Sequence, residues 1–161
     1  DGRGKAKMTQ ETQFPAPDFS LPSDTGETVS LAGLKGQAFV LFFYPRDNTP
    51  GCTTEAKGFS ADLGAFEAAG ARVFGVSKDS LESHGKFRAK QELTVPLLSD
   101  EHGSLREDLD VWTEKKMYGK SFMGIERSTF LIDAAGTVVR AWRKVKVPGH
   151  VDDVLAAVKA L

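Results

Sequence analysis

Short apolar runs alternate with amphipathic segments along this chain, which is the pattern of an α/β domain. The run Ala38–Tyr44 (AFVLFFY) is apolar throughout and rich in aromatic residues, as expected for a strand buried on both faces. Arg72–Ser77 and Ser128–Ile132 have the same character. Thr137–Trp142 follows the last of these after an Asp133–Gly136 turn, so the two segments predict a β-hairpin.

Helical spacing appears between these strands. Phe59, Leu63 and Phe66 recur on one face and predict a single helix that starts near Pro50 and ends at Gly70. It follows the first buried strand directly, which is the order of a strand–helix unit.

Further elements follow in the second half of the chain. A helix is predicted over 80–91, with Leu81 and Phe87 facing inward. A short strand at 96–98 and a short helix at 103–109 come next. A last helix is predicted from its apolar face, which is made by Val151, Val154, Leu155, Val158 and Leu161.

A small hairpin is predicted ahead of the first buried strand. Its arms are Asp18–Leu21 and Thr28–Leu31, and Ser23–Gly26 carries the turn signal between them. The predicted fold class is therefore α/β, with a central mixed β-sheet flanked by helices and an N-terminal hairpin extension. A thioredoxin-like fold fits this order, although periodicity alone leaves a small flavodoxin-like fold open.

The chain is expected to form one domain. Its 161 residues suffice for a single core. Residues 1–8 are read as a leader, either a remnant added for expression or a processed natural N-terminus, because Met8 is the first methionine. Residues 9–161 are the predicted domain.

Charge and hydropathy restrict the partners. The 21 Lys and Arg against 22 Asp and Glu give a net charge of −1, so no nucleic-acid partner is predicted. No apolar run approaches the roughly 20 residues of a membrane helix, and no secretory signal pattern opens the chain. We predict a cytoplasmic protein with no membrane partner, monomeric or weakly dimeric.

Candidate chemistry centres on Cys52, because it is the one cysteine of the chain. One cysteine excludes an internal disulfide, a Cys-x-x-Cys redox pair and a cysteine-based zinc site within one chain. A lone cysteine is most often a small buried hydrophobe. Cys52, however, follows Thr49-Pro50-Gly51 in the first turn of the predicted helix, where free N–H groups and the helix dipole favour a thiolate.

The residues around Cys52 resemble the peroxiredoxins. Pro45 to Cys52 (PRDNTPGC) fits the signature Pro-x-x-x-Thr-x-x-Cys, and the longer string FYPRDNTPGCTTE is similar to the peroxiredoxin Q, or bacterioferritin comigratory protein, branch. The similarity runs from Ala16–Phe19 through Ile125–Asp133 to the last helix. It implies a thioredoxin-like fold and a thiol peroxidase that reduces hydrogen peroxide and organic hydroperoxides without a cofactor or metal.

The resemblance also implies roles for four catalytic residues. Cys52 would be the nucleophile that becomes a sulfenic acid, and Arg127 would be the cation that holds its thiolate. Thr49 would bond the sulfur and the peroxide, and Pro45 would shield the sulfur from water. Without the resemblance, Thr49 would be only an N-cap, Pro45 only a strand terminator and Arg127 only a surface charge; we expect Thr49 to serve both as N-cap and as a catalytic residue.

Three further residues are secondary candidates for binding substrate. The amide of Gly51 adds a donor near the sulfur. Glu55 is read either as an exposed acid in the first helical turn or as an orienting partner of Arg127. Phe43 is read as core or pocket wall.

This chain departs from its suggested branch in one respect. Members commonly carry a second, resolving cysteine, and the two places where it would lie hold Lys57 and Arg88. We therefore predict a one-cysteine cycle in which an external thiol, such as thioredoxin or glutaredoxin with glutathione, reduces Cys52. The alternative is a peroxide sensor or redox-regulated binding protein that uses the same cysteine.

Other polar residues give no site. The three histidines, His84, His102 and His150, lack metal-ligand spacing and are predicted to lie on the surface. The pair Lys115-Lys116 is predicted to lie in a solvated loop.

Overall fold

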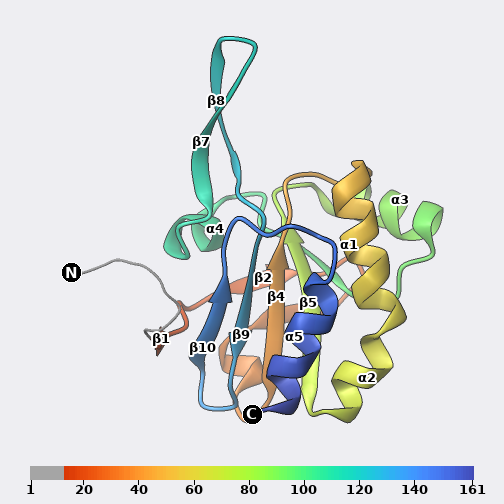
Figure 1. Ribbon diagram of the computed structural model, residues 1–161, viewed down its shortest axis with the longest axis vertical. Helices are drawn as coiled ribbons and strands as arrows, with labels where there is room; N and C mark the ends of the chain where they lie inside the picture. Colours follow the sequence, from red (N-terminus) through yellow and green to blue (C-terminus); the bar gives the residue numbers. More distant parts are fainter. Residues whose placement is uncertain (1–12) are drawn as a thin grey trace.

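A mixed sheet of six strands organises the molecule (Figure 1). The computed structural model describes residues 13–161. The strand order is β1-β10-β9-β4-β5-β6; β4, β5 and β6 are parallel, and β9, β10 and β1 alternate in direction beside them. The strands are β1 (Phe14–Pro15), β4 (Ala38–Phe43), β5 (Ala71–Ser77), β6 (Leu97–Ser99), β9 (Ser128–Ile132) and β10 (Thr137–Trp142).

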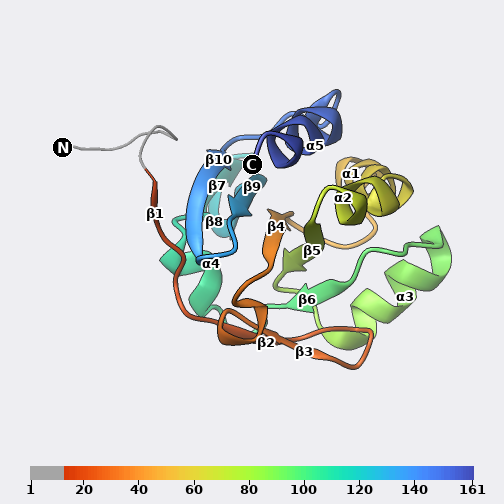
Figure 2. The ribbon, with the colours of Figure 1, turned by 90° about the horizontal axis from the view of Figure 1, so that it is seen from below.

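Helices and a small hairpin cover the two faces of this sheet. Figure 2 shows α1, α2 and α5 on one face and the β2–β3 hairpin with α4 on the other. Within residues 13–161, no helix is long and apolar enough to cross a bilayer. The helices are α1 (Pro50–Ala61), α2 (Leu63–Ala68), α3 (Leu81–Gln91), α4 (Ser104–Asp108), α5 (His150–Lys159) and the 3₁₀ turn η2 (Ala32–Leu34).

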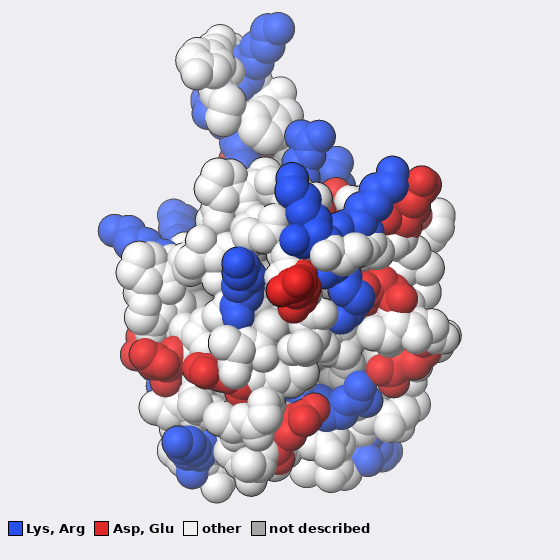
Figure 3. Space-filling view, turned by 90° about the vertical axis from the view of Figure 1, so that its right-hand side faces the viewer, with Lys and Arg blue, Asp and Glu red and all other residues white. Residues whose placement is uncertain are grey.

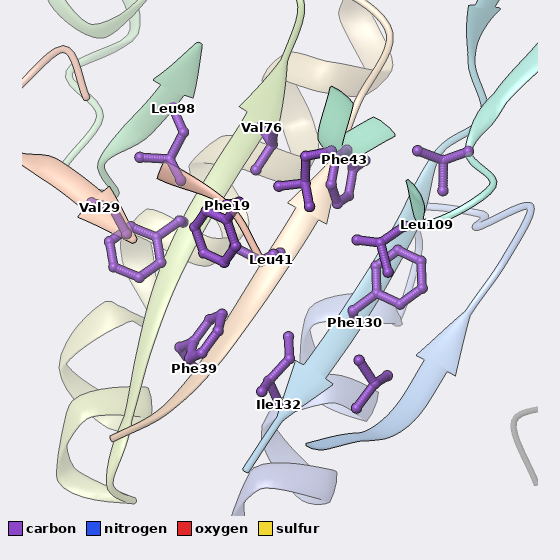
Figure 4. Packing of buried hydrophobic residues seen from close by; sticks show 14 of the residues in the cluster. Phe19, Val29, Phe39, Leu41, Phe43, Val76, Leu98, Leu109, Phe130 and Ile132 are labelled. Carbon is purple, nitrogen blue, oxygen red and sulfur yellow. The ribbon is translucent and has the colours of Figure 1, made fainter. Parts of the chain in front are cut away.

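Strand β4 supplies side chains to both halves of the core. Phe39, Leu41 and Phe43 point into the cluster in Figure 4, whereas Val40 and Phe42 pack under the helices on the other face. All five are at most 2% exposed. The prediction of a strand buried on both faces is confirmed.

The predicted N-terminal hairpin is also present. It is formed by β2 (Ser20–Pro22) and β3 (Thr28–Ser30), which pair as a separate two-stranded sheet. Val29 from this hairpin is buried in the core cluster of Figure 4. The predicted leader, residues 1–8, lies outside the described residues.

Two helical predictions are wrong in detail. The single helix expected up to Gly70 is interrupted at Asp62, whose φ of −98° and ψ of 8° separate α1 from α2. The turn lets Phe66 bury itself against Phe59. Leu81, expected to face inward, is 39% exposed at the start of α3, whereas Phe87 is fully buried as expected.

A long hairpin projects from the body where a loop was expected (Figure 1). It consists of β7 (Trp112–Met117) and β8 (Lys120–Ile125), so Lys115 and Lys116 lie in a strand. Lys and Arg side chains lie on it and on the adjoining top of the body (Figure 3). Buried and exposed residues do not alternate along its two strands, because both faces of the hairpin are largely exposed to solvent. The sequence therefore shows no strand periodicity in this segment.

The surface prediction for His150 is wrong. Its ring lies edge-on to Phe59 and Trp142, and its Nε2 is 2.7 Å from the hydroxyl of Thr129. The pKa of His150 is lowered from 6.5 to about 4, mainly by burial; the charge of Asp153 opposes this shift and the charge of Arg127 adds to it. The imidazole is therefore a neutral part of the core near neutral pH.

His150 should make the fold sensitive to acid. Its pKa is lower in the folded than in the unfolded chain, so its contribution to stability is present above pH 6.5 and is lost as the pH falls toward 4. At about 1.4 kcal/mol per pKa unit, the loss approaches about 3 kcal/mol. Urea unfolding at pH 7 and pH 4.5 should show that His150→Gln gains stability relative to the parent on acidification. A pH-independent difference between the two proteins would contradict this.

Candidate active site

Cys52 lies where a buried strand turns into a helix. β4 ends at Phe43, the half-buried Pro45 opens the following loop, and α1 begins at Pro50. Thr49 has the extended backbone of an N-cap residue, with φ −89° and ψ 154°. Cys52 is therefore in the first turn, as predicted, and is 1% exposed.

Arg127 approaches this turn from the neighbouring strand. β9 runs antiparallel to β4, and the register that pairs Phe43 with Ser128 sets Arg127 just beyond the end of β4. Its Nη2 donates to Cys52 Sγ at 3.4 Å, and its Nη1 donates to Glu55 Oε1 at 2.6 Å. The guanidinium therefore connects the sulfur with a carboxylate one turn further along α1.

Glu55 is a buried carboxyl group, so its prediction as an exposed acid is wrong. Its side chain is fully buried, and its Oε2 has no hydrogen-bond partner among the described residues. Burial raises the pKa of Glu55 to about 7, even though the charge and hydrogen bond of Arg127 act in the opposite direction. The carboxyl group therefore changes its charge near neutral pH, next to the cation that faces Cys52.

Gly51 leaves room for the guanidinium. A Cβ atom at this position would lie 3.0 Å from Arg127 Nη2, which is tighter than ordinary packing. The absence of a side chain therefore lets Arg127 lie against the backbone of the helix start. This steric role was not predicted from the sequence.

Thr49 and Phe43 differ from their simplest interpretations. The Thr49 hydroxyl donates to the carbonyl of Arg46 at 2.9 Å and does not cap the helix, so its interpretation as a side-chain N-cap is wrong. Phe43 is fully buried and lies edge-on to Phe130. It forms part of the core beneath the site and presents no surface to a substrate.

Lys115 is a neighbour that sequence reasoning missed. Its side chain lies across Gly124, and its Nζ donates to the carbonyl of Ile125 at 2.6 Å. Burial, and next the positive charge of Arg127, lower the pKa of Lys115, while the charge of Cys52 opposes them. A second cation therefore stands near the sulfur, carried by a hairpin whose sequence gave no periodic signal.

The histidine nearest the loop is also buried. His84 is fully inaccessible in α3, so its surface prediction is wrong, whereas His102 is exposed as expected. Both ring nitrogens of His84 have hydrogen-bond partners, namely Asp47 and the carbonyl of Leu98. A sequence with isolated histidines offers no signal for such a contact, because the partners come from distant segments.

A groove of about 680 Å³ adjoins the start of α1. It runs along the helix from Pro50 and Gly51 to Asp62. The segment 147–149 and the beginning of α5 form its opposite wall. Its surface is mostly apolar, so it suits a hydrocarbon group better than a charged one.

Comparisons with known proteins agree with this arrangement. Residues 13–141 match the model of the AhpC/TSA family. Peroxiredoxin Bcp of Bacillus subtilis is 51% identical over 152 residues, which cover 94% of this chain and 97% of that protein. Peroxiredoxin Bcp of Xanthomonas campestris is 52% identical over 150 residues, which cover 92% of this chain and 94% of that protein.

Solved structures show the same likeness in three dimensions. Peroxiredoxin Q of Xanthomonas campestris superposes with a TM-score of 0.84 at 52% identity, covering 88% of this chain and 90% of that one. The fold is thus the thioredoxin-like fold of the peroxiredoxins, and the molecule is a thiol peroxidase. More narrowly, the chain belongs to the AhpC/TSA family, in its peroxiredoxin Q, or Bcp, branch.

Removing the guanidinium should slow the oxidation of Cys52 by peroxide. Arg127→Ala deletes the donor at 3.4 Å from Sγ, so the rate of the first oxidation at pH 7 should fall roughly a hundredfold, as when a preorganised charge-stabilising donor is lost. Stopped-flow mixing of reduced protein with hydrogen peroxide measures this rate. Lys116→Ala, which removes an exposed cation of the hairpin, is the matched control and should react at the parent rate. An unchanged rate in Arg127→Ala would remove Arg127 from the site.

The Glu55 carboxyl group should reduce stability as the pH rises. The pKa of Glu55 is about 7 in the folded chain against an ordinary 4.5. Its contribution to the free energy of unfolding is therefore fully present below pH 4.5 and is lost as the pH rises through 7. Glu55→Gln should therefore become more stable relative to the parent between pH 5 and pH 8, by up to about 3 kcal/mol. Urea unfolding at the two pH values measures the difference. Glu67→Gln, at an exposed position of α2, should show no such trend.

Proposed function

We propose that this peroxidase reduces hydrogen peroxide and organic hydroperoxides through Cys52, and that an external thiol then restores the cysteine. The observation that carries the proposal is the position of the Arg127 guanidinium. It bonds Cys52 Sγ at the amino end of a helix, where the free N–H groups and the helix dipole also favour a negative sulfur.

The chemical step forms one bond and breaks another. The Cys52 thiolate attacks one peroxide oxygen, an S–O bond forms, and the O–O bond breaks. The leaving oxygen takes the electron pair and a proton to become water or an alcohol, and Cys52 becomes a sulfenic acid. Arg127 offsets the negative charge that spreads from sulfur to oxygen in this step, and the amides of Gly51 and Cys52 add donors.

The loop before the helix supplies the remaining contacts. The hydroxyl hydrogen of Thr49 is committed to the carbonyl of Arg46, so its oxygen is left to accept the O–H of an incoming peroxide. We assign Pro45, which is half-buried at the start of this loop, the role of shielding the sulfur from water. Glu55 acts through Arg127, because its Oε1 accepts a hydrogen bond from Arg127 Nη1 at 2.6 Å.

The groove along α1 supports a substrate larger than hydrogen peroxide. It starts at Pro50 and Gly51, beside Cys52 in sequence, and has a mostly apolar lining. A solved structure of the Xanthomonas campestris bacterioferritin comigratory protein is described in terms of alkyl peroxide reduction activity. We assign the groove of this chain to the hydrocarbon part of an organic hydroperoxide.

The single cysteine requires a reductant from outside the chain. Solved structures of Xanthomonas campestris peroxiredoxin Q include two different Cys→Ser variants, whereas this chain has one cysteine. At the two positions considered for a resolving thiol, Lys57 is exposed and Arg88 is paired with Asp24 at 2.5 Å. Thioredoxin, or glutaredoxin with glutathione, is the proposed reductant. A cytoplasmic location and a monomeric or weakly dimeric state stay predictions.

Replacing the nucleophile tests the function. Cys52→Ser should abolish peroxide consumption, because a neutral serine hydroxyl is not a comparable nucleophile and cannot form a sulfenic acid. Peroxide consumption is followed with dithiothreitol, with a thioredoxin system, and with glutaredoxin plus glutathione. The parent should consume many equivalents of peroxide with at least one of them. Consumption that stops after one equivalent with every reductant would favour the peroxide-sensor alternative, and consumption by Cys52→Ser would refute the proposal.

A further inference from the structure

A buried hydrogen-bond network fixes the loop between β4 and α1. Its centre is the carboxylate of Asp47, which is 7% exposed. The Tyr44 hydroxyl donates to Asp47 Oδ1 at 2.6 Å, and the Ser83 hydroxyl donates to Oδ2 at 2.7 Å. His84 Nδ1 lies 2.8 Å from the same Oδ2. We call these four side chains the loop anchor, because three of them hold the fourth inside the loop.

The geometry around His84 requires a charged ring. Its Nδ1 faces the carboxylate of Asp47, and its Nε2 lies 2.9 Å from the carbonyl of Leu98. Burial raises the pKa of Asp47, but its hydrogen bonds to His84, Tyr44 and Ser83 and the charge of His84 outweigh burial and lower that pKa. A carbonyl oxygen only accepts, and the ionised carboxylate of Asp47 only accepts as well, so both ring nitrogens donate. Burial lowers the pKa of His84, but the hydrogen bond and charge of Asp47 outweigh it, so the pKa ends above its ordinary value.

The backbone of the loop is held at the same point. The N–H of Asp47 donates to Asp79 Oδ2 at 2.9 Å, and Ser77 donates to the same oxygen at 2.7 Å. The loop is therefore attached to the end of β5 as well as to α3. Pro45 and Thr49 flank this attachment, two residues away on either side.

A metal ion is a poorer explanation of the same groups. Asp47, Asp79 and His84 each have a potential ligand atom within 4.8 Å of the others. Both nitrogens of His84 already have partners, and the Asp47 Oδ2 has two. A cation would have to displace these bonds, so the donor set fits a proton-bonded network better than a metal site.

We propose that Asp47 and His84 are positioning residues, whose ionic hydrogen bond holds the loop and Cys52 in the geometry that reacts with peroxide and thereby limits access of the reducing thiol. This inference rests on the proposed function. Its first half follows from the chain of contacts, because the loop anchor fixes the segment that carries Pro45 and Thr49 into the first turn of α1.

The second half follows from the burial of the sulfur. To reduce a sulfenic acid, an incoming thiolate attacks Cys52 Sγ, an S–S bond forms, and the S–O bond breaks with release of water after protonation. A second thiol then exchanges with this mixed disulfide and leaves Cys52 reduced. Sγ belongs to a residue that is 1% exposed, so the attack on it requires the loop or the first turn to move.

Two substitutions of one residue separate the two hydrogen bonds of His84. His84→Gln places an amide near the position of Nε2 and loses the donor to Asp47, whereas His84→Asn keeps a donor near Nδ1. For His84→Gln, stopped-flow oxidation by hydrogen peroxide should slow about tenfold, since a small misplacement of reacting groups costs one to two orders of magnitude. Reduction of the oxidised variant by dithiothreitol should become faster than in the parent. His84→Asn should stay within about threefold of the parent in both steps.

The matched control removes a contact of the same helix, α3, at a place distant from the loop between β4 and α1. Asp24→Asn removes the ion pair with Arg88 on α3, so it should lower the stability of the fold while leaving both rates unchanged. Ser83→Ala removes one hydroxyl donor to Asp47 and serves as a milder variant if His84→Gln fails to fold. It should shift both rates in the same directions by a smaller factor.

Specific outcomes would overturn the proposal. The first is oxidation of His84→Gln by hydrogen peroxide at the parent rate. The second is an equal fall of the oxidation rate and the reduction rate in His84→Gln. The third is slower oxidation together with faster reduction in Asp24→Asn. Hydrogen exchange of the amides of residues 46–49 in the reduced proteins gives a readout that is independent of peroxidase activity. It should be faster in His84→Gln than in the parent, and unchanged exchange would refute the loop anchor even if the proposed function itself fails.

Discussion

The site depends on one guanidinium that serves two acidic partners. Arg127 is the charged group that joins Cys52 Sγ to Glu55, and its place follows from sheet register and not from local sequence. Because β9 pairs with β4 in the register that sets Ser128 opposite Phe43, Arg127 falls just past the end of β4. A slip of one residue would turn the guanidinium to the other face of the sheet. The buried pairing of these two strands is thus a condition for the chemistry as well as for the core.

The net charge of the side chains around the Cys52 sulfur changes near neutral pH. Burial raises the pKa of Glu55 to about 7, so near neutrality this carboxyl group is divided between a neutral acid and a carboxylate. In its neutral form it leaves the charge of Arg127 to the sulfur; in its ionised form it competes for that charge at 2.6 Å. Lys115 adds a second positive charge from the hairpin. The attraction felt by a thiolate at Cys52 is therefore set by three side chains from three separate segments.

The sequence predicted the parts of the fold that rest on local pattern. The continuous apolar run of β4 is the pattern of a strand buried on both faces, and it needs no knowledge of the rest of the chain. The Pro-x-x-x-Thr-x-x-Cys signature likewise indicates the helix start that follows this strand. The burial of His84 and Glu55 had no such signal, because a polar side chain is buried only when distant segments supply its partners. The β7–β8 hairpin was missed because its two strands are largely exposed on both faces. Neither face has to be apolar, so the sequence of the hairpin shows no alternating pattern.

These features place two demands on one segment. Oxidation needs Cys52, Thr49 and Arg127 held in a fixed, water-poor arrangement, because preorganised charges act most strongly there. Reduction by an outside thiol needs the same sulfur to be reached. A chain with a resolving cysteine could meet the second demand within itself, but here Arg88 is committed to Asp24. The contacts that hold the loop 45–49 then govern both steps, since whatever strengthens them favours the encounter with a small peroxide and hinders that with a larger thiol. The balance between the two half-reactions is accordingly a property of the loop and its attachments, and not of the sulfur alone.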